Sequence, residues 1–485
     1  MLVHFALLVC TLFGASSAES FKQVLTSNVS STTISTVQLS KLCDVCSCSE
    51  SQVDCSNRNL TTTFEISQWP KIEVTTITFQ GNQLVHLTIF PDITVDKLIF
   101  KENQITKIDD LTFVNLKNLT ELDLSYNNLT YELLSPHAFQ GHFSPILYEP
   151  LDKLTVLNLG HNQLHKLHQD LFEHLTNLKV LSLDGNPFSV IDQSTTLAIS
   201  SIPYLEELDL SYCNLKSISD HLFHSPKHLK LIHLQGNKLK TPPAALEDAK
   251  SLEYLCLNDN PIEIIDDDNG FPEMPQLKEL SICHMSRLTR IGSGAFGKLP
   301  MLENLRLENC PQLSEIDEDA FINKSFEGAI WPPLRKLEIA NNALRYLPAN
   351  LVGRWDKLEK LSLTNNAWSC DCENQFMIGS LLPNLAPQLM GKEVETLSCS
   401  SPPEHKGKNL TSLVHRHLRC LDLYNARPEK DATILIGILI GVLLAVPVSL
   451  ALFVFWRKGF FFCGTQGPAT YSRAFYKRAD KDDDF

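Results

Sequence analysis

The residues with the clearest chemistry are two groups of four cysteines, the first spaced C-x2-C-x-C-x6-C and the second opening with C-x-C. The groups are Cys43, Cys46, Cys48 and Cys55, and Cys370, Cys372, Cys399 and Cys420. Thiols at such spacings either bind zinc or form disulfides. Residues 1–20 hold an apolar run followed by small residues, which predicts a secretory signal peptide. We expect disulfides, because exported thiols are oxidised, and the spacing leaves three connectivities open in each group.

Two further clusters could hold a metal ion. His161, His165 and His168 lie close together, and residues 266–268 are three consecutive aspartates. The histidine spacing matches a metal site poorly, and the aspartates lack the alternating spacing of a calcium loop and are typical of a solvated turn. The sequence has no nucleophile-elbow, zinc-protease, Walker or dinucleotide-binding pattern in a supporting context. We expect no enzyme, no metal and no cofactor.

The element that must position these residues is a repeated phrase, L-x-x-L-x-L-x-x-N-x-L. It returns about every 24 residues and appears twelve times within residues 74–368. The alternating apolar residues predict a short strand with one buried face, and the Asn side chain bonds the backbone of the following turn. Cys213 and Cys310 occupy the Asn position in two repeats, where we expect buried free thiols. One repeat cannot bury its own apolar face, so neighbours must stack.

This phrase, together with its flanking cysteines, resembles the leucine-rich-repeat family over roughly residues 43–424. The resemblance implies an α/β solenoid: a curved array with a parallel sheet on its concave face. It also implies an N-terminal cysteine cap over residues 43–73 and a C-terminal cap over 369–424. Within the caps it implies first-to-third and second-to-fourth pairing, namely Cys43–Cys48, Cys46–Cys55, Cys370–Cys399 and Cys372–Cys420.

Two other cysteines, Cys256 and Cys283, are predicted on the exposed sheet face of consecutive repeats. Their offset along neighbouring strands places the two Cα atoms near or beyond the distance that a disulfide can bridge. We leave this pair unassigned.

The side chains that flank the buried strand residues point out of the concave face, so candidate ligand-binding residues can be named. They are Glu121, Asp123, Asp184, Glu207, Asp209, His233, Tyr254 and Arg306. An acidic stripe of this kind suits a partner with basic patches, while the alternative is a solvated sheet face with no partner. The net charge of −14 argues against nucleic acid as the partner.

Two insertions interrupt the repeats, at about residues 136–152 and 323–333, and both contain aromatic residues. Loops that project from a rigid scaffold often carry recognition. The alternative, that the insertions only enlarge the convex side and bind nothing, explains them equally well.

A second apolar run, residues 432–456, has 25 residues without a charge and predicts a transmembrane helix. Arg457 and Lys458 follow it directly, which predicts a type I plasma-membrane protein with its N-terminus outside the cell. Gly437, Gly441 and Ala445 recur every fourth residue, so a lateral helix partner could pack there, although small residues are common in such helices.

The remaining segments are a Ser/Thr-rich arm (21–42), a stalk (425–431) and a cytoplasmic tail (457–485), which is too short for a kinase and would act through an adaptor. Within the tail, Tyr471 and Tyr476 could be phosphorylated, and Cys463 is either palmitoylated or unmodified. Six N-x-S/T sequons predict N-glycans on the outer side. They begin at Asn28, Asn59, Asn118, Asn128, Asn323 and Asn409.

These observations favour a cell-surface recognition or adhesion receptor, or a co-receptor, whose solenoid binds an extracellular protein or glycan. Two alternatives remain open from the sequence. One is an auxiliary membrane subunit that modulates a channel or another receptor, and the other is an innate immune recognition protein.

Overall fold

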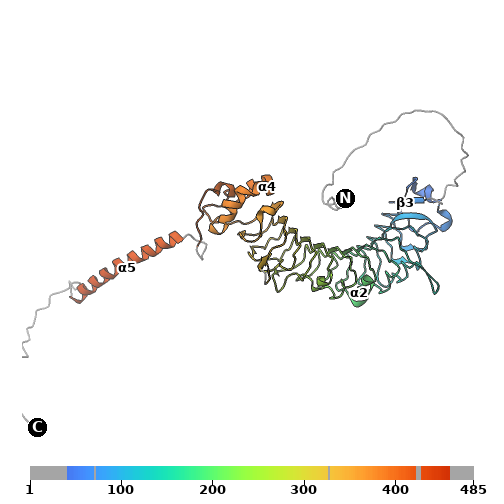
Figure 1. Cartoon of the computed structure of the whole chain (residues 1–485), viewed down its shortest axis with the longest axis horizontal. Helices are drawn as coiled ribbons and strands as arrows, with labels where there is room; N and C mark the ends of the chain where they lie inside the picture. The colour runs from blue at the N-terminus through green and yellow to red at the C-terminus, as the bar shows by residue number, and fades with distance from the viewer. Residues whose placement is uncertain (1–40, 70–72, 326–327, 422–427, 459–485) are drawn as a thin grey trace, which may run out of the picture.

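The computed structural model describes residues 41–69, 73–325, 328–421 and 428–458. Within these ranges the chain forms a curved array of stacked repeats (Figure 1). The signal peptide, nearly all of the Ser/Thr-rich arm, Asn28, Cys463 and the tail tyrosines lie outside the described residues.

One 14-stranded sheet runs the length of the array, and its strand order is β1-β2-β3-β5-β7-β10-β11-β12-β13-β14-β16-β18-β22-β23. The two cap strands are β1 (Ser47–Cys48) and β2 (Gln52–Asp54). The first six repeat strands are β3 (Glu73–Thr78), β5 (Thr94–Ile99), β7 (Glu121–Asp123), β10 (Val156–Asn158), β11 (Val180–Ser182) and β12 (Glu207–Asp209). The last six are β13 (Leu231–His233), β14 (Tyr254–Cys256), β16 (Glu279–Ser281), β18 (Asn304–Arg306), β22 (Lys336–Glu338) and β23 (Lys360–Ser362).

Short elements complete the array on its other sides. Small parallel sheets contain β4 (His86–Leu87), β6 (Lys107–Ile108), β15 (Ile264–Ile265), β17 (Arg290–Ile291) and β19 (Glu315–Ile316). The two insertions form antiparallel hairpins from β8 (His142–Ser144) and β9 (Leu147–Glu149), and from β20 (Asn323–Ser325) and β21 (Gly328–Ile330). The helices of the array and caps are α1 (Lys41–Val45), α2 (Gln193–Ser200), α3 (Leu382–Asn384) and α4 (Ala386–Met390), and short turns include η2 (Ala244–Asp248) and η3 (Trp355–Lys357). In Figure 1, α2 lies on the outer side of the curve.

The repeated phrase explains the sheet. Each of the twelve predicted repeats supplies one strand, and neighbouring repeat strands pair in parallel with their central apolar residues in register, as Leu122, Leu157 and Leu181 do. These three residues are fully buried. Because a one-residue slip would turn every buried leucine to solvent, the apolar pattern fixes the register. The predicted solenoid with its concave parallel sheet is confirmed.

A ladder of asparagines ties each repeat to the one before it. The Asn186 amide Nδ2 donates to the carbonyls of Leu159 (2.9 Å) and Leu183 (2.9 Å), and its Oδ1 accepts from the backbone N–H of Leu164 (3.0 Å). Cys213 fills the same slot one repeat later as a buried free thiol, and Cys310 does so further along, as predicted.

The residue that precedes each asparagine of the ladder, or the cysteine in the same slot, has a φ in the left-handed region. Tyr126, His161 and Tyr212 occupy this position with φ between 51° and 56°, a conformation that bulky residues rarely adopt. The equivalent position in the following repeat provides space for two of the rings. A Cβ on Gly185 would meet the His161 ring at 2.5 Å, and one on Gly236 would meet the Tyr212 ring at 2.1 Å. Glycine therefore lets these aromatic side chains lie along the edge of the sheet.

Phenylalanines and disulfides close the core. Phe90, Phe113 and Phe139 stack in series with ring centroids 6.0 and 5.9 Å apart. The structure forms four disulfides with the pairing implied by the family resemblance: Cys43–Cys48, Cys46–Cys55, Cys370–Cys399 and Cys372–Cys420. Both ends of the array are thereby capped, as a solenoid requires.

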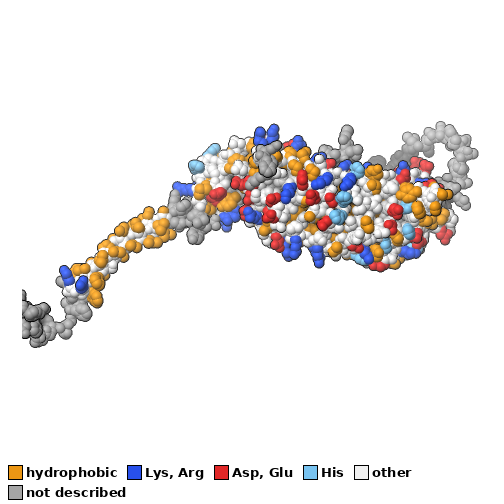
Figure 2. Space-filling model, turned by 60° about the horizontal axis from the view of Figure 1, so that its bottom comes forward, with side chains coloured by type: hydrophobic (Ala, Val, Ile, Leu, Met, Phe, Trp, Pro, Cys, Tyr) orange, Lys and Arg blue, Asp and Glu red, His pale blue; other side chains and the backbone are white. Residues whose placement is uncertain are grey.

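The last described element is α5 (Pro428–Arg457), a helix that begins four residues before the predicted span. Its stretch Ala432–Arg457 is long and apolar enough to cross a membrane. Hydrophobic side chains cover its visible face in Figure 2, whereas the face of the array shown there mixes charged, polar and apolar residues.

The concave face as the candidate binding site

The concave face presents two rows of side chains, one on each side of the buried central residues of the strands. From β7 to β14 the first row is Glu121, Val156, Val180, Glu207, Leu231 and Tyr254. The second row is Asp123, Asn158, Ser182, Asp209, His233 and Cys256. Six of the eight predicted ligand-binding residues fall in these rows. Asp184 comes two residues after β11, and Arg306 lies in the second row two strands beyond Cys256.

The first row contains three half-buried aliphatic residues that the sequence analysis did not single out: Val156, Val180 and Leu231. They occupy the outward positions of their repeats, where a charged or polar residue is more usual on a solvated sheet. Each of the three directly precedes the central buried residue of its repeat, and an apolar residue at that outward position could have been noticed in the sequence. These side chains give the concave face an apolar centre beside its acids.

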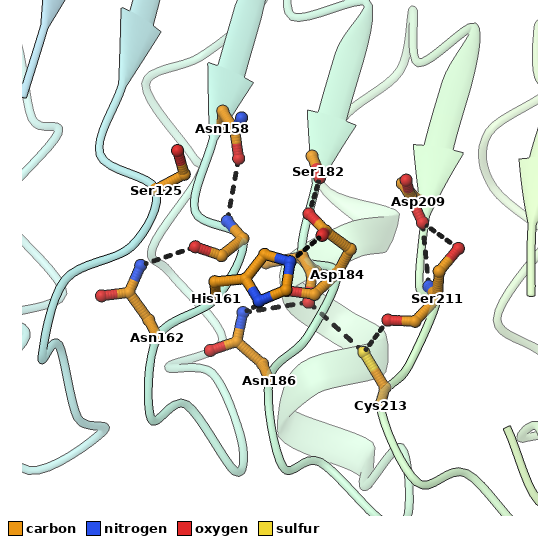
Figure 3. A network of polar contacts seen from close by, with 12 residues as sticks. Ser125, Asn158, His161, Asn162, Ser182, Asp184, Asn186, Asp209, Ser211 and Cys213 are labelled. Carbon is orange, nitrogen blue, oxygen red and sulfur yellow. Dashed lines mark hydrogen bonds and ion pairs between the residues drawn. The ribbon is translucent and has the colours of Figure 1, made fainter. Parts of the chain in front are cut away.

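His161 and Asp184 form a pair across two repeats (Figure 3). The imidazole Nε2 lies 2.9 Å from Asp184 Oδ2, and Ser182 Oγ donates to Asp184 Oδ1 at 2.6 Å. The Tyr126 ring stacks on His161 with centroids 4.1 Å apart. His161 is thus a partner of the acidic stripe and not part of a metal site.

Asp209 lies at the middle of the stripe. Its Oδ1 accepts a hydrogen bond from the backbone N–H of Ser211 at 2.8 Å, and burial raises the pKa of its carboxyl. No lysine or arginine forms an ion pair with it among the residues that the structure describes. A nearby group that can carry a positive charge is His233, whose charge interacts with that of Asp209.

His233 and Glu207 lie next to Asp209. His233 Nε2 is 3.3 Å from Glu207 Oε1. Burial alone would lower the pKa of His233, but the hydrogen bond to Glu207 and the charge of Asp209 outweigh it and raise this pKa. We call Asp184, Glu207 and Asp209, with His161 and His233, the central acidic patch.

The raised pKa of Asp209 gives a stability prediction. A carboxyl with a raised folded-state pKa stabilises the fold when protonated, below the ordinary carboxyl pKa, and this contribution is lost as the pH rises through the raised value. Asp209→Asn retains an acceptor for Ser211 and should raise the melting temperature at pH 7 by roughly 1–2 °C. Thermal melts should show this gain shrinking toward pH 4. An unchanged or lower melting temperature at pH 7 would contradict the assignment.

Cys256 and Cys283 correct the prediction of an exposed pair. Both are buried, and both are free thiols. Ser281 Oγ, from the same face, lies 3.7 Å from Cys283 Sγ. The half-buried Tyr254 shares strand β14 with Cys256. Burial raises the pKa of both thiols, which favours their protonated form.

Tyr254 and Arg306 are less available than the sequence predicts. Tyr254 is half-buried beside Cys256, and burial raises its pKa. Arg306 lies 3.2 Å from Glu338, a buried carboxylate that also pairs with Lys360. The acids and histidines from the turn after β10 to β13 are therefore brought together, while Arg306 belongs to a separate ion cluster.

The other two histidines of the predicted cluster, His165 and His168, each contact a side chain outside that cluster. His165 lies 3.8 Å from Glu132, and the His168 ring stacks on Tyr131 with centroids 4.1 Å apart. Within the described ranges, no group of three or more His, Cys, Asp or Glu side chains could hold a metal ion.

The described sequons lie outside the central acidic patch. Asn59, Asn118, Asn323 and Asn409 are exposed. Asn128 is half-buried and accepts a hydrogen bond from Gln163 at 3.2 Å. N-glycosylation at all of these positions stays a prediction.

Stacked repeats, an asparagine ladder and two disulfide caps define a capped leucine-rich-repeat protein. A family model described as leucine rich repeat matches residues 93–142, 149–197 and 203–262. The chain is 28% identical to podocan from Mus musculus over 313 residues, which cover 55% of this chain and 48% of podocan. It is 31% identical to keratocan from Coturnix japonica over 232 residues, which cover 47% of this chain and 57% of keratocan. The chain spans about half the length of these curated relatives.

One solved structure is similar to part of this chain. A chain from an octameric complex of Latrophilin 3, Unc5D and FLRT2 has 20% identity and a TM-score of 0.45, covering 76% of this chain and 96% of that one. The chain thus contains leucine-rich repeats, and it has one helix that is long and apolar enough to cross a membrane.

Proposed function

We propose that the chain is a cell-surface recognition or adhesion receptor, or a co-receptor, that binds an extracellular protein through its concave face. The observation that carries this proposal is the central acidic patch beside Val156, Val180 and Leu231. Carboxylates around an apolar centre suit a protein segment that carries Lys or Arg next to an apolar residue, because opposite charges steer encounter and apolar burial slows dissociation. The proposal contains no catalytic step.

The proposed setting is the plasma membrane, with α5 as a single type I span. Support comes from the apolar stretch Ala432–Arg457 and from the cations Arg457 and Lys458 at its end. This orientation places the caps, the repeats and the sequons outside the cell, where disulfides persist.

An auxiliary membrane subunit is the second candidate. Gly437, Gly441 and Ala445 recur at every fourth residue of α5 and would let another helix approach closely. Exchange of α5 for a neutral apolar helix separates the two functions: an auxiliary subunit loses its effect, whereas a ligand-binding receptor keeps its affinity. Recognition of a glycan or of a microbial ligand by the same face is tested by adding such molecules to the binding screen described next.

The test is a binding screen of the full chain on cells against secreted and cell-surface proteins. The expected ligand is basic, and Asp209→Lys should weaken its binding by at least roughly tenfold through loss of one close charge pair. The matched control is Glu318→Lys, which reverses an exposed acid away from the sheet. A ligand bound equally well by wild type and Asp209→Lys would overturn the assignment of the concave face.

A further inference from the structure

The β8–β9 hairpin exposes apolar side chains on a rigid projection. Phe143 pairs with Tyr148 across the hairpin, and the tip residue Ile146 is 97% exposed. Phe143, Leu147 and Tyr148 are 65%, 46% and 50% exposed. We call these four residues the apolar knob. So many exposed apolar side chains within six residues are rare on a monomer and typical of an interaction site.

Contacts with the next repeat hold the apolar knob in place. The Phe143 and Tyr148 rings lie 5.9 and 5.0 Å from the buried His174 ring, and the Tyr148 hydroxyl donates to the Glu173 carbonyl at 3.3 Å. At the base, a Cβ on Gly141 would lie 2.0 Å from the Glu149 carbonyl oxygen, so the two strands approach closely because of glycine. A hairpin fixed in this way loses little conformational entropy on binding.

The surroundings of the apolar knob are acidic. The cavity beneath it is lined by Asp170 and Glu173 together with His137 and His174, and by no lysine or arginine. Glu149 on β9 is exposed as well. A partner that receives the apolar knob should therefore offer an apolar cleft with basic residues at its rim.

The chain carries such a cleft at its second insertion. A cleft of about 670 Å³ lies between the segment that follows β21 and the turn before η3, and Ile330, Trp331 and Pro332 form part of its apolar wall. Arg335, Arg354 and Lys357 are the cations of its lining. We call it the Trp331 cleft. Its volume accommodates several apolar side chains.

Part of the positive charge at the Trp331 cleft is not neutralised by carboxylates of the described residues. Arg354 pairs with Asp356 at 2.6 Å, and Arg335 lies 3.5 Å from Glu359. Lys357 is exposed and forms no ion pair with any residue that the structure describes. An acidic projection would therefore find one free cation and two exposed guanidinium groups at the rim.

We propose that the apolar knob of one copy of this chain inserts into the Trp331 cleft of a second copy. Both hairpins directly precede a sheet strand, β10 and β22, so they leave the array from the same side. A twofold axis between two antiparallel copies can then form both contacts at once, as an isologous interface requires. The interface does not involve the concave face, which stays free for the ligand.

Photo-crosslinking of the purified full chain tests the proposal directly. A photoreactive amino acid at position 146 should produce crosslinked dimers whose attachment sites map to residues 329–335 or 352–359 of the other copy. The chain is treated with a glycosidase beforehand, because an N-glycan on Asn323, the strand partner of Ile330, would stand beside the cleft. Monomers alone, or attachment to the concave strands or to α5, would overturn the proposal.

A matched pair of variants provides the quantitative readout. Ile146→Asp should weaken dimerisation by about a hundredfold, because two isoleucines per dimer lose their apolar clefts. The control Val190→Asp places the same charge at another exposed aliphatic position, 55% exposed, and should leave the dimer unchanged. Both variants should match the wild-type melting temperature, since neither site is in the core. Equal weakening by the two variants, or by neither, would contradict the knob-in-cleft contact.

Discussion

Replacing Cys372 and Cys420 together by serine is expected to destabilise the C-terminal cap by about 4 kcal/mol. The disulfide between them spans 48 residues, and removal of a cross-link over a loop of that length restores this much chain entropy to the unfolded cap. The cap covers the apolar end of the array, where Trp368 and Leu363 are 1% and 0% exposed. Loss of the cap should therefore expose the last repeats first.

Amide hydrogen exchange of the full chain measures this effect at each strand. Exchange should accelerate strongly at β22 and β23 and stay unchanged at β7 to β12, because repeats contact only their neighbours. Cys256→Ala, which removes a buried free thiol, serves as the control and should cost about 1 kcal/mol. Wild-type protection at β23 in the double serine variant would contradict the capping role.

Asn186→Ala should destabilise the centre of the array by about 2 kcal/mol. Asn186 is fully buried, and its removal leaves the backbone N–H of Leu164 without a partner. The carbonyls of Leu159 and Leu183 each lose one donor and keep another, Asn162 Nδ2 and Cys213 Sγ. Each buried group left unpaired costs about 1–3 kcal/mol. Urea unfolding of the variant should show a clearly lower midpoint.

The ladder itself supplies the control for Asn186→Ala. Cys213 occupies the same slot and donates from Sγ to the Leu183 carbonyl at 3.3 Å, so Asn186→Cys should lose less stability than Asn186→Ala. Equal midpoints for the two variants would show that side-chain hydrogen bonding at this slot contributes little.

The sequence predicts the fold well because one short repeated motif determines which side of every strand is buried. The positions of Leu122, Leu157 and Leu181 determine the register and thereby list the outward residues, including Glu207 and Asp209. The cysteine spacing locates the caps, while their pairing came from the family resemblance.

The details of the site depend on contacts between repeats that a periodic pattern does not encode. His161 pairs with Asp184 because a left-handed turn directs its ring over Gly185, and the histidine spacing alone did not indicate this partner. Cys256 occupies an outward position, yet it is buried, on the same strand as the half-buried Tyr254. Burial on the concave face therefore does not follow from the outward position alone.

The insertions were harder to interpret because they interrupt the repeat. Residues 142–149 do not follow the repeat, and only their pairing as β8 and β9 shows that Phe143 and Tyr148 lie opposite each other. Their contacts with His174 arise across repeats, and no local sequence signal predicts them.

We expect the partner to bind the concave face, and a single glycan placed on that face would block it. Val180→Asn creates an N-x-S sequon with Ser182 in the first row, beside Val156 and Glu207. Ser217→Asn creates one with Ser219 at an exposed position off the sheet and serves as the control. Ligand binding to cells that display each glycosylated variant is then measured. We expect binding to be lost for Val180→Asn and retained for Ser217→Asn. Full binding by glycosylated Val180→Asn would contradict binding of the partner at the concave face.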